Sequence, residues 1–255
     1  MLDNVRSSQY AYAVLRLSVA MCFIGHGIFG IITKQVWCNY FALFGIGPTL
    51  AYQLMPVVGL VDIVMGLGVI FYPLRLFFVW LVIWGLGTAL FRPMAGEPLA
   101  EMVERAGNYG APLALLLLDK GNRQKSDLRI VDVSRVLISP NGAIWCLKIT
   151  ACCLLAGHGW LNVLGKKAWE DQYHALSGFD GHQVAIVLGC VELAGALLIQ
   201  IERLSGLILL FLFWKMVTEA LYPHYPFIEW IERGGSYGVL LAAWYLRNRF
   251  SQANK

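Results

Sequence analysis

The residues 15–27, LRLSVAMCFIGHG, decide the fold, because they return as residues 147–159, LKITACCLLAGHG. The two stretches align without a gap at an offset of 132 residues. In each, a cation (Arg16 or Lys148) is followed by apolar residues and then by Gly-His-Gly. A helix rises 1.5 Å per residue, so the ten residues between cation and histidine span about 15 Å, roughly half the apolar core of a bilayer. Each stretch therefore predicts a membrane-spanning helix with a cation toward one surface and a histidine toward the other.

The composition is that of a membrane protein. Of the 255 residues, 58% are hydrophobic and 14% are charged, whereas soluble domains contain about 25% charged residues. The polar first ten residues, with no small-residue cleavage site after them, predict that there is no cleaved signal peptide. None of the six cysteines forms a C-x-x-C motif, so we expect them to be small apolar residues of the core.

The apolar stretches predict an all-α polytopic membrane protein with eight transmembrane helices arranged as two parallel four-helix repeats. The first four-helix unit would be residues 1–119, the second 143–255, and 120–142 a polar cytoplasmic linker. The loop 33–51 predicts a short helix in the membrane interface. The expected spans are 10–32, 53–72, 75–92, 106–118, 143–165, 182–201, 204–222 and 234–246.

The distribution of lysine and arginine predicts the orientation. The N-terminus, the turns at 73–75 and 202–203, the 119–141 segment and the C-terminal tail form one set of loops, in which the 119–141 segment and the tail have the densest excess of basic residues. Basic loops remain in the cytoplasm. We therefore expect both termini to be cytoplasmic, in a bacterial inner membrane, with His26 and His158 toward the outer side. The net charge of +4 follows from this topology and does not predict a nucleic-acid partner.

The repeat extends beyond the first helix. Asp62 corresponds to Glu192 and Trp84 to Trp214, both at an offset of 130 residues. The segment 104–110, ERAGNYG, corresponds to 232–238, ERGGSYG. Because four spans are an even number, both units would have the same orientation in the membrane.

The run 39–71, NYFALFGIGPTLAYQLMPVVGLVDIVMGLGVIF, resembles the DoxX/DoxD-like four-helix membrane proteins. The resemblance rests on residues 25–34 at the end of the first helix, on Leu-Phe-Gly-Ile-Gly-Pro at 43–48, and on Asp62 followed by glycines at 66 and 68. In the second half Glu192, followed by Gly195, fills the acidic position. The resemblance implies two fused units, and a function in quinone-linked thiosulfate oxidation or a membrane thiol-redox complex.

Two histidines are the first candidate site residues. His26 and His158 would ligate haem b or a metal, relay protons, or hydrogen-bond a neighbouring helix. Their flanking glycines favour close approach of a helix backbone or a porphyrin. A pseudo-two-fold axis could bring the histidines together as paired haem ligands; otherwise they line two separate pockets.

Two intramembrane carboxylates are the second set of candidate site residues. Asp62 and Glu192 would either form ion pairs with Arg16 and Lys148 or act as protonatable groups beside a quinone. We list Asp62, Glu192 and Glu219 as candidate catalytic acids. The candidate cofactor-binding residues are His26, His158, Arg16, Lys148, Tyr109 and Tyr237.

The remaining polar residues have structural explanations as well. Glu104 and Glu232 suit helix N-termini, and Tyr109 and Tyr237 either face the histidine pocket or belong to the aromatic belt. Lys215 and Glu219, four residues apart in the second half only, predict an internal ion pair or a working site confined to that half. The segment 222–226 with Glu229 would then cover it.

Three functions remain open. The first is a membrane redox subunit, as of a quinone-linked oxidoreductase, that holds a quinone or haem near the outer face beside other membrane or periplasmic redox subunits. The second is a transporter of small solutes, ions or lipids whose path is lined by the intramembrane charges. The third is a non-catalytic assembly subunit. All three place the chain in a lipid bilayer, and the sequence has no motif of a soluble hydrolase or nucleotide-binding enzyme.

Overall fold

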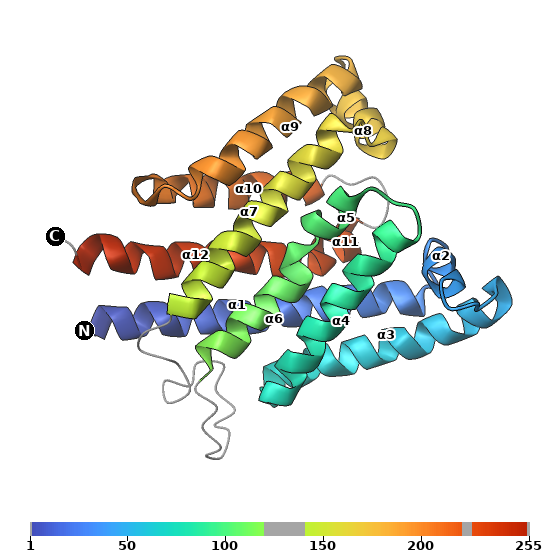
Figure 1. Ribbon diagram of the computed structural model, residues 1–255, viewed down its shortest axis with the longest axis horizontal. Coiled ribbons are helices and arrows are strands. Elements are labelled where there is room, and N and C mark those ends of the chain that lie inside the picture. The colour runs from blue at the N-terminus through green and yellow to red at the C-terminus, as the bar shows by residue number, and fades with distance from the viewer. Residues whose placement is uncertain (1, 120–140, 221–225, 254–255) are drawn as a thin grey trace.

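Figure 1 shows the computed structural model of the chain, which consists of helices and connecting segments. The structure describes residues 2–119, 141–220 and 226–253. These described residues contain no β-strand. The predicted linker 120–142 therefore lies almost wholly outside the described residues, as do residues 222–225. The elements are α1 (Leu2–Ile31), α2 (Trp37–Ala42), α3 (Pro48–Phe71), α4 (Arg75–Met94), α5 (Leu99–Glu104), α6 (Ala106–Leu118), α7 (Asn141–Val163), α8 (Lys167–Ser177), α9 (Gly181–Leu198), η2 (Glu202–Leu204), α10 (Ser205–Ala220), α11 (Pro226–Glu232) and α12 (Gly234–Ala253).

Five of these helices are long and apolar enough to cross a membrane, which indicates a membrane protein in a lipid bilayer. They are Arg6–Ile31, Pro48–Phe71, Arg75–Met94, Asn141–Val163 and Gly181–Leu198. The sequence predicted eight spans; of the others, α6 has 13 residues and α10 has 16. The second span begins at Pro48 rather than near residue 53, because proline fits the first turn of a helix.

Arg16 is buried where the sequence placed a cation inside the first span. Its guanidinium donates from Nε to the carbonyl of Val69 at 3.2 Å, and a second nitrogen donates to the carbonyl of Ile70. Both carbonyls lie in the last turn of α3, where helix carbonyls have no partner within the helix. Arg16 of α1 therefore donates hydrogen bonds to carbonyl groups at the end of α3.

The helices of the two halves make matching contacts. In the first half α1 packs on α3 and α4 on α6, and in the second α7 packs on α9 and α10 on α12. Between the halves, α1 packs on α12 and α7 on α6. Figure 1 shows α1 beside α12 in the middle, with α3 and α9 on opposite sides and both termini at the same end. The opposite end of the molecule carries α2, α5, α8 and α11, and we call it the distal end.

The Gly-His-Gly motif is explained by this packing. A Cβ added at Gly25 would lie 2.5 Å from the backbone nitrogen of Glu232, and one at Gly157 would meet the backbone of Glu104. These glycines thus let each half approach the Glu-Arg segment of the other. The second glycine of each motif faces its own half, since a Cβ at Gly159 would lie 2.8 Å from the carbonyl of Gly189. Each histidine is therefore held between two close helix contacts.

Candidate functional site

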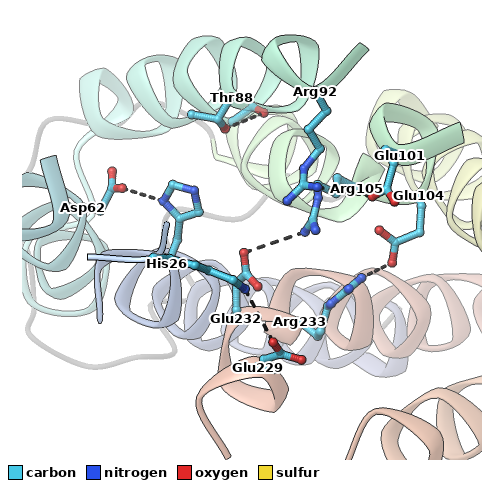
Figure 2. A network of polar contacts seen from close by, with 12 residues as sticks. His26, Asp62, Thr88, Arg92, Glu101, Glu104, Arg105, Glu229, Glu232 and Arg233 are labelled. Carbon is cyan, nitrogen blue, oxygen red and sulfur yellow. Dashed lines mark hydrogen bonds and ion pairs between the residues drawn. The ribbon is translucent and has the colours of Figure 1, made fainter. Parts of the chain in front are cut away.

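His26 of α1 and Asp62 of α3 form a pair near the distal end, which we call the first site. The Nδ1 atom of His26 lies 2.7 Å from Oδ2 of Asp62, and the aspartate is fully buried. The ring of Trp37, on α2, packs on the imidazole with 4.7 Å between centroids. With Nδ1–H donating to the carboxylate, Nε2 is the imidazole atom that remains for other chemistry. Figure 2 shows this pair beside a network of charged residues.

His158 of α7 and Glu192 of α9 form the second site. The Nδ1 atom of His158 lies 2.6 Å from Oε2 of Glu192. The same oxygen accepts from Nδ2 of Asn162 at 3.0 Å, and the other accepts from the indole N–H of Trp214 at 3.2 Å. The phenol of Tyr173 donates to Asn162 at 3.0 Å. Both oxygens of Glu192 thus accept hydrogen bonds from other residues of the second half.

A cavity of about 210 Å³ opens beside the first site. Residues with aromatic rings, His26 among them, make up half of its lining. It is smaller than the roughly 300–1,000 Å³ of pockets that enclose a drug-sized ligand, so it suits a single ring rather than a whole large ligand. The lining residues are His26, Phe29, Lys34, Trp37, Tyr40, Phe41, Phe44, Ile46, Val58, Trp84, Thr88, Phe91, Arg92, Arg105, Asn108 and Glu232.

The cations around the cavity are paired. Arg92 lies 2.8 Å from Glu97 and 3.3 Å from Glu101, and Lys34 lies 3.5 Å from Glu229. Burial would raise the pKa of Glu101, but the nearby cations, Lys166 first, outweigh it and hold that pKa at about 2. Glu101 thus stays ionised and joins α4 of the first half to Lys166 of the second, at 2.6 Å.

Two reciprocal ion pairs connect the halves. Arg233 pairs with Glu104, and Arg105 pairs with Glu232 at 3.7 Å (Figure 2). The sequence explained both glutamates by the helix dipole, but each carboxylate meets an arginine of the other half. Burial would raise the pKa of Glu232, and Arg105 lowers it below its ordinary value.

Lys215 and Glu219 form the internal ion pair that the sequence predicted. Their charged atoms lie 2.8 Å apart, both side chains are fully buried, and the phenol of Tyr237 donates to Glu219 at 2.6 Å. Their counterparts in the first half are Gly85 and Ala89. The cavity described above lies in the first half, so the structure does not favour the interpretation that only the second half works.

The predicted pairing of the intramembrane carboxylates with Arg16 and Lys148 is wrong. Asp62 and Glu192 bond the histidines of their own halves. Lys148 instead lies over the ring of Trp145, 5.1 Å from its centroid. A span of about 15 Å along the helix separates each cation from its histidine, so the carboxylates meet the nearer group.

Tyr109 and Tyr237 do not line the cavity. Tyr109 donates to the carbonyl of Met102 at 3.4 Å, and Tyr237 is taken up by Glu219. The sequence analysis missed Trp37, although Lys34-x-x-Trp37 returns as Lys166-x-x-Trp169 at the same offset of 132 residues. Trp169 packs on His158 at 4.3 Å between centroids, as Trp37 does on His26. Glu229 of the expected cover segment contacts Lys34 of the first site, not the second site.

The arrangement does not fit a haem held between the two histidines. His26 and His158 bond carboxylates on α3 and α9, which lie on opposite sides of the molecule in Figure 1. Among the described residues, no three His, Cys, Asp or Glu side chains gather as a metal site. The first site does offer an imidazole, a buried carboxylate and aromatic walls, which suit a flat, uncharged ring with hydrogen-bonding oxygens.

Comparison of the chain with protein-family models, with curated proteins and with solved structures finds no match.

Proposed function

We propose that the chain is a quinone-binding subunit of a membrane redox system and that the first site holds the quinone ring. The observation that carries the proposal is the His26–Asp62 pair on the wall of an aromatic cavity. The imidazole Nε2 would face a carbonyl oxygen, and Asp62 would hold the ring in place and stabilise it when it is protonated. A bound quinone would contribute the ability to take up and release electrons and protons together. This chain's residues bind it and exchange its proton.

The proposal includes eight spans in two parallel four-helix units. Its support is the matching set of helix contacts in the two halves and the position of both termini at one end (Figure 1). The short α6 and α10 lie between other helices of the bundle, which favours a span shorter than the usual ~20 residues. With both termini in the cytoplasm of a bacterial cell, the distal end and the first site would lie toward the outer surface. We keep the DoxX/DoxD-like relationship as part of this proposal.

The test is equilibrium binding of a short-chain ubiquinone analogue to the purified protein in nonionic detergent. Quenching of tryptophan fluorescence reports binding, because Trp37 and Trp84 line the cavity. We expect one equivalent to bind and His26→Gln to weaken binding by roughly 10- to 100-fold, as for one hydrogen bond to a group that becomes charged. The matched control is His158→Gln, which we expect to bind as the wild type does. Absence of saturable binding, or equal loss in both variants, would overturn the proposal.

Absorption spectra of the oxidised and the dithionite-reduced protein make a second, independent test. We expect no haem band from the two histidines. A haem band that disappears in both His26→Ala and His158→Ala would contradict the separate sites described above.

A further inference from the structure

Two buried polar atoms of the first site have no hydrogen-bond partner among the described residues. They are the indole Nε1 of Trp84 and Oδ1 of Asp62. A buried N–H without a partner destabilises a folded protein, so such a group is uncommon and calls for an explanation. Trp84 also lines the cavity, and the neighbouring ring of Trp80 stacks on it at 6.0 Å between centroids. The indole is therefore held in place with its donor unused.

The second site shows what becomes of the same two groups when they meet. Its counterparts, Trp214 and Glu192, bond each other at 3.2 Å. Glutamate is longer than aspartate by one methylene, and both carboxylates keep their histidine at 2.6–2.7 Å. Asp62 is the shorter of the two carboxylates, and neither its Oδ1 atom nor the indole N–H of Trp84 has a partner among the described residues.

The second site supplies three further groups that the first site lacks. Asn162 and Tyr173 correspond to Gly30 and Phe41, and Lys215 corresponds to Gly85. Asn162 bonds Glu192, Tyr173 bonds Asn162, and Lys215 pairs with Glu219. Protein groups therefore bond both carboxylate oxygens of the second site, whereas the first site borders the cavity and the indole N–H of Trp84 has no partner among the described residues.

We infer that the N–H of Trp84 is a ligand contact, and that the ligand of the first site carries two acceptor oxygens. One would accept from Trp84 and the other from Nε2 of His26, since both side chains line the same cavity. This inference rests on the proposed function and narrows the ligand to a ring with carbonyl oxygens on two sides, as in a para-quinone. Asp62 is then a specificity-determining residue, because its length keeps Trp84 available.

The decisive experiment lengthens one side chain. Asp62→Glu retains the charge and the bond to His26 but allows the carboxylate to reach the indole, as Glu192 does. We expect this variant to bind the short-chain ubiquinone analogue at least 10-fold more weakly than the wild type. Trp84→Phe, which removes only the donor, should weaken binding by roughly 3- to 10-fold, as for a neutral hydrogen bond. The matched controls Glu192→Asp and Trp214→Phe should bind as the wild type does.

A ligand with one carbonyl removed provides the complementary measurement. A monoketone analogue of the same ring should bind the wild type more weakly than the quinone does. In the Trp84→Phe variant the difference in affinity between the two ligands should be smaller. Thermal unfolding of each variant identifies any that fail to fold, and Trp84→Phe keeps the test available if Asp62→Glu does. If the wild type binds the quinone and both first-site variants bind it equally well, the inference is overturned while the proposed function survives. If the wild type binds no quinone, the proposed function itself fails.

Discussion

Replacing Lys215 by methionine tests how the second half of the molecule is held together. Methionine has a similar length and is apolar and flexible, so it fills the space without adding a polar group. The substitution leaves Glu219 buried with only the phenol of Tyr237 as a partner. Unit charges 2.8 Å apart attract each other by about 6 kcal/mol at an effective dielectric constant of 20, and breaking a buried pair on one side typically costs about 3–5 kcal/mol.

We therefore expect Lys215→Met to lower the free energy of unfolding by about 3–5 kcal/mol. For a chain of this size that corresponds to a fall of roughly 6–20 °C in the unfolding midpoint.

The assay is thermal unfolding in nonionic detergent at pH 7, followed by tryptophan fluorescence. The double variant Lys215→Met with Glu219→Gln is the matched control, because the amide oxygen still accepts from Tyr237 and no charge is left unpaired. We expect the double variant to unfold within a few degrees of the wild type, since replacing a whole buried pair is often neutral. A single variant as stable as the double variant would refute the reasoning.

Two further predictions concern the contacts between the halves. Gly25→Ala should destabilise the protein by about 1–3 kcal/mol, because the new Cβ would meet the backbone of Glu232 at 2.5 Å; Gly87→Ala, with nothing within 4 Å, should be neutral or stabilising in the same unfolding assay. Since the pKa of Glu101 is lowered from 4.5 to about 2, its stabilisation is complete above pH 4.5 and is lost as the pH falls toward 2. Glu101→Gln should therefore be less stable than the wild type by roughly 3 kcal/mol at neutral pH, and the difference should vanish near pH 2; a constant difference across this range would contradict the ion-pair explanation.

The sequence predicted the helical class and pointed to the buried histidines and carboxylates as candidate site residues. It did not predict which of these residues pair with one another. Period and hydropathy located the long helices, and the exact repeat of Gly-His-Gly identified both histidines. Which carboxylate or cation a buried group meets depends on how neighbouring helices rotate and cross. Arg16 and Asp62 therefore looked like partners on charge alone, although Arg16 serves the carbonyls at the end of α3.

The cavity was also beyond the reach of the sequence. Its walls come from α1, α2, α3, α4 and α6 together with Glu232 of the other half, and no local pattern relates such distant residues. The difference between Gly85 and Lys215 was visible in the alignment of the two halves. The alignment did not show which of the two halves contains the cavity. A lysine and a glutamate within a membrane helix suggest activity, whereas here they occupy space and bond each other.

The reciprocal Glu-Arg pairs give the joined halves the contacts of a two-fold dimer, in which each partner gives what it receives. Two separate copies of one unit would have to carry identical pockets, so that any side chain plugging one would plug both. A single polypeptide removes that restriction. The second half bonds both oxygens of Glu192 with its own groups, while the first half retains a cavity and takes Glu232 of the second half into its wall. Joining the halves in one chain thus permits a difference between them that a symmetric assembly of identical copies does not allow.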